Sequence, residues 1–173
     1  MLPLAHIGFT SAAVRVIEKG LRLRAIDYRI LIVASLLPDL IDKPLARLLE
    51  SSLTYESRAF GHSLMFLGLI AICMMLQRLC SNTFFLFPVF CGVLLHDVFD
   101  VMWLHQEIFL WPLYGWDFTK PENEAWTGFI QLNGYKIKQL DFFDNISVLI
   151  LLWFFMKLAL GGKLVEFMRK GHL

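Results

Sequence analysis

The stretch GVLLHDVFDVMWLHQEIFLWPLYGW, residues 92–116, decides how the rest of the chain is interpreted. Its apolar run leads into His96, Asp97 and Asp100 and continues into a segment rich in Leu and Trp. An ionisable side chain in nonpolar surroundings costs several kcal/mol unless it is paired, hydrated or bound to a metal. The stretch therefore predicts a helix that ends at a polar centre.

The composition is that of a membrane protein. Of the 173 residues, 57% are hydrophobic and 18% are charged, and the mean hydropathy is +0.60. Ordinary soluble domains are less hydrophobic and more highly charged. Because the composition does not shift along the chain, we expect residues 1–173 to form a single domain. We expect membrane lipids as partners and no nucleic acid, and the sequence does not indicate an oligomeric state.

Hydrophobic periodicity places several helices along the chain. Apolar runs predict helices over residues 3–19, 30–41, 61–76, 83–99 and 146–160, and Pro38 is expected to break the second of them. Residues 45–58 predict an amphipathic helix along the interface. The expected fold is all-α: a multi-span membrane bundle with four to five transmembrane or deeply embedded helices plus the interfacial helix. No run is a clean apolar twenty-mer, so a soluble all-helical protein is the alternative.

The charges decide between these alternatives. If successive helices alternate in direction, one side of the bundle carries ten basic and three acidic residues, and the other carries six basic and twelve acidic. Basic loops stay in the cytoplasm, so the charges predict a multi-pass protein of the cytoplasmic membrane with its N-terminus outside. An aromatic belt is expected at the outer side, formed by Trp103, Trp111, Tyr114, Trp116 and Trp126.

The same alternation brings six potential metal ligands to the outer ends of the helices. His96 and Asp100 are four residues apart and share a helix face, as do Asp39 and Asp42, three apart. Taken singly, such residues are more often a satisfied polar pair or a solvated helix end. Together they supply the nitrogen and oxygen donors that zinc or a pair of divalent ions accepts. The predicted ligands of one or two ions, zinc or alternatively manganese, are His6, Asp39, Asp42, His62, His96 and Asp100.

Several motifs resemble a known family, the predicted membrane-bound metal-dependent hydrolases that include the YdjM-like inner-membrane proteins. The matching stretches are His6 with Gly8, SLLPDLIDKP at 35–44, RAFGHSL at 58–64, GVLLHDVFD at 92–100 and FLWPLYGW at 109–116. They span about the first two-thirds of the chain. Bacterial members typically read PDID followed by His, whereas this chain reads PDLIDK, so both Asp39 and Asp42 remain candidate ligands.

More distantly, the order His, Asp, His, HxxxD is similar to zinc-dependent phospholipase C and its related single-strand nucleases. That similarity implies that His6, Asp39, His62, His96 and Asp100 are ligands and that Asp100 bridges two metals. The C-terminal HxxxE of those enzymes has no counterpart after Asp100, so a mononuclear or dinuclear site is expected.

The resulting hypothesis is a membrane-bound metal-dependent hydrolase that acts at the outer interface by metal-activated water. The location favours a lipid or lipid-linked substrate, and the phospholipase resemblance implies a phosphoester. Asp39 or Asp42 is the expected general base, and Arg58 is expected to bind a phosphate oxygen. The alternative is a non-catalytic metal-binding membrane scaffold or a transport protein.

Overall fold

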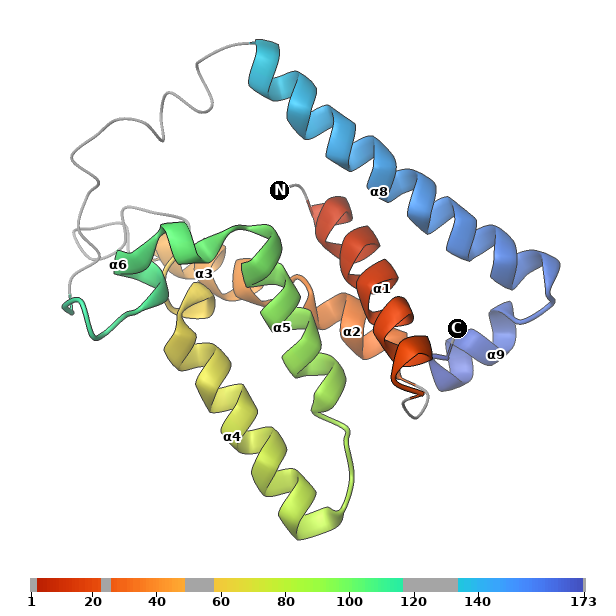
Figure 1. The fold of residues 1–173 in the computed structure, drawn as a ribbon, viewed down its shortest axis with the longest axis horizontal. Helices are drawn as coiled ribbons and strands as arrows, with labels where there is room; N and C mark the ends of the chain where they lie inside the picture. The colour runs from red at the N-terminus through yellow and green to blue at the C-terminus, as the bar shows by residue number, and fades with distance from the viewer. Residues whose placement is uncertain (1–2, 23–25, 49–57, 117–133, 173) are drawn as a thin grey trace.

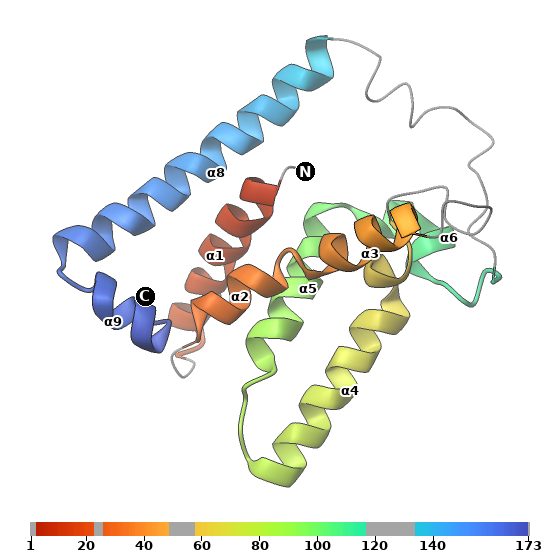
Figure 2. The same ribbon diagram turned by 180° about the vertical axis from the view of Figure 1, so that it is seen from behind.

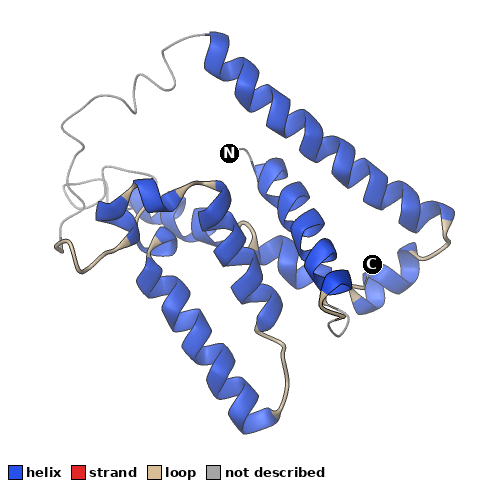
Figure 3. Ribbon diagram, in the orientation of Figure 1, coloured by secondary structure: helices blue, strands red, loops and turns tan. Residues whose placement is uncertain are grey.

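The computed structural model describes residues 3–22, 26–48, 58–116 and 134–172. Within these ranges every regular element is helical and no strand occurs (Figure 3), so the predicted all-α class is confirmed. The elements, in chain order, are α1 (Pro3–Gly20), α2 (Tyr28–Ala34), α3 (Leu37–Leu48), η1 (Phe60–His62), α4 (Leu64–Ser81), α5 (Phe87–Phe99), η2 (Met102–Leu104), α6 (Gln106–Phe109), α8 (Gly134–Leu160) and α9 (Leu164–Lys170).

Helices α4 and α5 form a hairpin beside α1 (Figure 1). Ser63 begins α4 by accepting a hydrogen bond from the Phe66 amide on its hydroxyl, and Asn82 ends the helix in a left-handed conformation with a φ of 53°. Helix α5 then starts at Phe87, four residues later than predicted, with a proline in its first turn. The hairpin thus returns the chain to the level of His62, where α5 ends at Phe99 and Asp100 caps it.

Among the described residues, two helices are long and apolar enough to cross a membrane. They are Leu64–Ser81 and Phe142–Leu160, with mean hydropathies of 1.9 and 1.8, and only 6% and 17% of their residues are buried inside the protein. A core helix of a soluble protein would instead bury its apolar side chains. Exposed apolar surface on this scale fits lipid contact.

The prediction of four to five such helices is not met by the described residues. Helix α1 has three charged residues among its 18, and α5 is apolar but only 13 residues long. Neither has both the length and the composition of an independent span.

The predicted helix over residues 30–41 is two helices, and they separate before Pro38 rather than at it. Helix α2 ends at Ala34 and α3 begins at Leu37, which places Pro38 in a first turn, where its missing N–H costs no hydrogen bond. The amphipathic helix therefore begins at Leu37, not at residue 45. Residues 49–57 of the predicted interfacial helix lie outside the described residues.

Close approaches between helices bring the polar residues together. A Cβ on Gly8 of α1 would lie 2.8 Å from the Ser147 Cβ of α8, and one on Gly92 of α5 would lie 2.6 Å from the Ala34 Cβ of α2. Only glycine lets these helices approach so closely. The start of α1, the start of α4 and the end of α5 consequently lie on the same side of the bundle (Figures 1 and 2).

Candidate metal centre

Three fully buried histidines from three separate elements meet at this end of the bundle. His6 comes from α1, His62 from η1 and His96 from α5, and each is 0% exposed. The carboxylates of Asp42, which is 1% exposed, and Asp100, which is 9% exposed, lie among them. Histidines buried to this extent need a partner for each ring nitrogen.

His62 is held by Asp42. The Nδ1 atom of His62 lies 2.7 Å from Oδ2 of Asp42, and the same carboxylate accepts hydrogen bonds from the amides of Ala59 (2.7 Å) and Gly61 (2.8 Å). A Cβ on Gly61 would lie 2.8 Å from the Pro38 carbonyl oxygen, so this loop packs directly on the start of α3. The carboxylate fixes both the ring orientation and the tautomer, in which Nδ1 carries the proton.

A backbone carbonyl orients His96 in the same way. Its Nδ1 atom lies 2.7 Å from the carbonyl oxygen of Ser35, in the break between α2 and α3. A carbonyl oxygen can only accept, so Nδ1 is the protonated nitrogen. The close packing of Gly92 on Ala34 and Ser35 holds α5 against this carbonyl.

The unprotonated Nε2 atoms of His62 and His96 consequently face each other. The Nε2 atoms of His62 and His96 are 3.1 Å apart, and the hydrogen bonds at both Nδ1 atoms leave each neutral ring with a lone pair on Nε2. Two facing lone pairs repel unless a cation lies between them. Two nitrogen ligands that are 2.0–2.1 Å from one tetrahedral zinc ion lie about 3.3 Å apart, close to the observed separation.

Asp39 completes this group from α3. Its Oδ1 lies 3.8 Å from the His62 Nε2, while its Oδ2 accepts a 2.7 Å hydrogen bond from Lys43. Burial acts to raise the pKa of Asp39, but the hydrogen bond from Lys43 and the positive charge of that lysine hold it below its ordinary value. Of the two candidate acids, Asp39 faces the Nε2 atoms, whereas Asp42 faces backbone amides and Nδ1.

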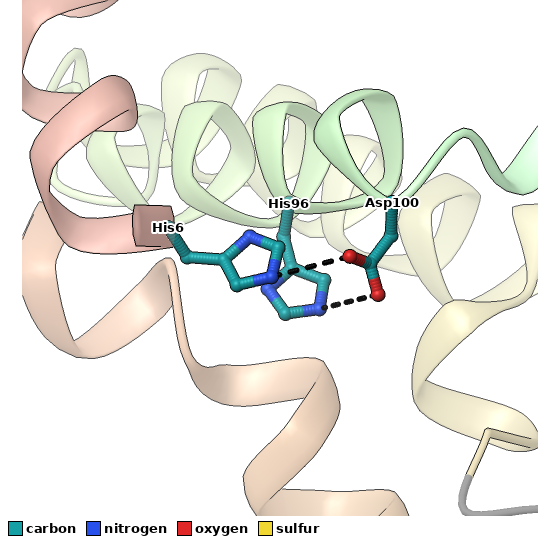
Figure 4. Close-up of side chains that lie close together, drawn as sticks. All are labelled: His6, His96 and Asp100. Atoms are coloured by element: carbon teal, nitrogen blue, oxygen red, sulfur yellow. Dashed lines mark ion pairs between the residues drawn. The ribbon is translucent and has the colours of Figure 1, made fainter. Parts of the chain in front are cut away.

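His6 and Asp100 form a second group beside the first (Figure 4). The His6 ring stacks on that of His96, with centroids 3.9 Å apart, and its Nε2 lies 3.2 Å from Oδ1 of Asp100. The other oxygen of Asp100 lies 3.9 Å from the His96 Nε2 and 2.5 Å from Nη2 of Arg58. Asp100 thus directs one oxygen toward His6 and the other toward the His62 and His96 pair.

The side chains of the centre form two groups that could hold a metal ion. Asp39, His62 and His96 form one set, and His6, His96 and Asp100 form another, each offering ligand atoms within 4.8 Å of one another. His96 belongs to both sets but has only Nε2 to offer, because Nδ1 binds Ser35. Two ions would therefore have to divide the ligands, with Asp100 between them.

Three further buried polar side chains were not predicted as site residues. Asp97 on α5, Thr10 on α1 and Asp144 on α8 have side-chain oxygens with no hydrogen-bond partner among the described residues, and both ring nitrogens of His6 also lack an aligned one. Buried groups of this kind are normally satisfied by water or an ion. Asp144 lies one turn before Ser147, the residue that contacts α1 at Gly8, but no sequence motif surrounds it.

Aromatic side chains lie beside the centre. Phe60, next to Gly61 of η1, packs edge-on against Trp111 at 4.9 Å, and Trp111 packs against Trp116 at 5.7 Å. Trp111 is buried, whereas Trp103, Tyr114 and Trp116 are exposed, as a belt at an interface requires. Trp126 of the predicted belt lies outside the described residues.

The fold and the centre define an all-helical membrane protein with a buried group of histidines and aspartates that could bind metal. The family model of the YdjM inner membrane proteins matches residues 1–169, and the chain belongs to this family. Comparisons with curated proteins and with solved structures gave no match, so the similarity to phospholipase C is not confirmed.

Proposed function

We propose that the protein is a membrane-bound metal-dependent hydrolase that acts on a phosphoester or lipid-linked substrate at the outer membrane interface. One observation carries the proposal: the Nε2 atoms of His62 and His96 face each other at 3.1 Å beside carboxylates, with both Nδ1 atoms already hydrogen-bonded. In a structural histidine pair, the N–H of one ring would donate a hydrogen bond to the lone pair of the other. Here neither Nε2 atom carries a proton, because each neutral ring has its proton on Nδ1.

The residues divide into ligands and positioning groups. His62, His96 and Asp39 would hold one ion, and His6 with Asp100 a second, with zinc or manganese suited to this donor set. A bound divalent cation supplies Lewis acidity, which makes water acidic enough to lose a proton near neutral pH and polarises an ester oxygen. Asp42 and the Ser35 carbonyl keep His62 and His96 in the tautomer that presents Nε2.

Of the two aspartates, Asp39 is the better candidate for a general base, a role open to it when His62 and His96 hold the ion and Asp39 is not itself a ligand. Its Oδ1 points toward the centre, whereas both oxygens of Asp42 accept hydrogen bonds and its side chain is 0% exposed. Arg58 brings a positive charge against Asp100 with a side chain that is 15% exposed. That position suits binding of an anionic substrate oxygen at the rim of the centre.

The proposed substrate side rests on the helix ends at which the centre lies, which the charge distribution predicts to be the outer ends. We propose that α1, α2 and α5 are embedded in the membrane beside the two candidate spans and that α3 lies along the interface. Ten of the 16 basic residues are then cytoplasmic, and the aromatic belt lies outside. A centre at this depth meets lipid head groups directly, which supports a lipid or lipid-linked substrate.

Hydrolysis by the detergent-purified protein tests the proposal. The protein, loaded with zinc or manganese, is incubated with a panel of phospholipids and lipid-linked phosphoesters, and released phosphate and alcohol are measured. We expect turnover that Asp39→Asn abolishes and that His172→Ala, a change far along the chain at the other end of the bundle, leaves intact. Metal binding without turnover on any substrate would instead favour the non-catalytic scaffold or transport protein.

A further inference from the structure

A cavity of about 420 Å³ lies at the end of the bundle opposite the metal centre, between α1 and the turn that joins α8 to α9. Figures 1 and 2 show the end of α8, the end of α1 and helix α9 gathered at this side. The lining residues are Arg15, Phe154, Lys157, Leu158, Gly161 and Lys163. The cavity shares no residue with the metal centre.

Three of the six lining residues are cationic, and none of the six is acidic. Two carboxylates interact with these cations: Glu18 binds Nη1 of Arg15 at 2.6 Å, and Glu166, three residues after Lys163, is paired with Lys170 at 3.0 Å. Glu18 also accepts hydrogen bonds from the Tyr28 hydroxyl at 2.9 Å and the Ile26 amide at 3.2 Å, so its charge is already shared among three donors. The cavity therefore has an excess of positive charge that an anion would neutralise.

The backbone of the turn between α8 and α9 places Lys163 at the cavity. Its amides bind carbonyl oxygens that would otherwise repel an anion. The Lys163 amide binds the Leu158 carbonyl oxygen at 2.9 Å, and the Gly161 amide binds that of Lys157 at 3.1 Å. Gly162 adopts a φ of 64°, a conformation that favours glycine, and turns the chain back. The carbonyl oxygens of Lys157, Leu158 and Ala159 at the end of α8 thus accept hydrogen bonds from the turn.

The inner wall is apolar and continues into lipid-facing surface. Phe154 and Leu158 are each 8% exposed, whereas the neighbouring Phe155 and Met156, on another face of the candidate span, are 57% and 56% exposed. The Lys157 ammonium lies over the ring of Trp153, 5.1 Å from its centroid, as at a membrane interface. A ligand with an anionic head and apolar tails fits both surfaces at once.

We infer that this cavity binds a phosphate group supplied by the head of an anionic phospholipid in the cytoplasmic leaflet. Basic pockets between helices at the cytoplasmic side are suited to such head groups. The inference requires a membrane protein, which the family establishes, and rests on the topology proposed above, but it is independent of the hydrolase proposal.

Lipid binding to the full-length protein tests this inference. Delipidated protein in detergent is titrated with phosphatidylglycerol or phosphatidylcholine, and bound lipid is counted by native mass spectrometry. Removing two basic residues is expected to weaken phosphatidylglycerol binding by about 30-fold in the double variant Lys157→Gln, Lys163→Gln. The matched control is Lys19→Gln, Arg22→Gln, which removes the same charge from exposed positions outside the cavity and should change binding less than about threefold.

Phosphatidylcholine and inorganic phosphate distinguish the sources of the phosphate. We expect phosphatidylcholine to bind weakly and equally to all three proteins, and inorganic phosphate alone not to bind measurably in a calorimetric titration. Equal binding of phosphatidylglycerol by the cavity and control variants would overturn the inference. Tight binding of inorganic phosphate without a preference for the anionic lipid would overturn it as well.

Discussion

Asp42→Asn separates the positioning role of this residue from the ligand role of Asp39. The Asp42 carboxylate serves three donors, the amides of Ala59 and Gly61 and the Nδ1 of His62. An amide side chain keeps one oxygen and puts an NH2 group in place of the other, so at least one buried donor loses its acceptor. Leaving one such group unsatisfied costs about 1–3 kcal/mol. A loss of about 2 kcal/mol lowers the melting temperature of a chain of this length by roughly 4–8 °C.

Metal affinity should fall as well, because the residue that orients a ligand typically contributes 10- to 100-fold. The comparison variant is Asp39→Asn, which removes a proposed ligand. The side chain that donates a hydrogen bond to Asp39 is Lys43, which is 47% exposed and can be hydrated when this bond is lost. We expect it to lose metal with little change in the melting temperature of the metal-free protein. Thermal unfolding without metal and competition titration with zinc measure the two effects. An Asp42→Asn variant that melts and binds zinc like the wild type would refute this reasoning.

The remaining predictions concern packing, the docking of α9 and topology. Gly92→Ala should destabilise the protein by about 1–3 kcal/mol and weaken metal binding through His96, because its Cβ would meet Ala34, whereas Gly68→Ala, which meets nothing within 4 Å, should be neutral or slightly stabilising in thermal unfolding. Arg29→Gln should release α9, because Arg29 donates to the carbonyl oxygens of Met168 and Arg169, and limited proteolysis should then cut α9 faster. The hydrogen bond from Arg29 lowers the pKa of Asp27 below its ordinary value of 3.8. The stability that the Asp27–Arg29 pair contributes is therefore complete above pH 3.8 and is lost as the pH falls through the lowered pKa. Hydrogen exchange in α9 should rise over that range. A reporter fused after Leu173 should be cytoplasmic, and an external reporter would contradict the proposed topology.

The convergence of the site residues could be predicted because it follows from helix direction alone. Once hydrophobic runs mark the helices and the charges orient them, His6, His62 and His96 fall at the same level. The i, i+4 spacing of His96 and Asp100 likewise fixes a shared face, and their side chains do approach to 3.9 Å.

The separate roles of Asp39 and Asp42 could not be predicted from their spacing. Both lie on one face of α3. They differ because the amides of Ala59 and Gly61 and the ring of His62 form hydrogen bonds with Asp42 and not with Asp39. Such a long-range backbone contact has no signature in the sequence. The Ser35 carbonyl that binds His96 arises in the same way, from a helix break that the sequence placed three residues later, at Pro38.

Among the described residues, fewer helices qualify as independent spans than the apolar runs predict. Residues 30–41 include the break between α2 and α3, and α5 loses its first four predicted residues to a turn. These helices contact one another and α1, so part of their apolar surface faces protein. Hydropathy alone does not distinguish such surface from surface that faces lipid.

The metal content of the purified protein tests the central claim most directly. Elemental analysis is carried out on the detergent-purified chain and on the variants His96→Ala and His172→Ala. His172 is the control, because it lies far from the centre, with its Nδ1 3.1 Å from the Ile26 carbonyl oxygen. The account predicts about one or two equivalents of zinc or manganese in the native protein and in His172→Ala, and a loss of metal in His96→Ala. If the native protein, after incubation with either metal, holds no more than His96→Ala, the facing histidines do not form a metal centre.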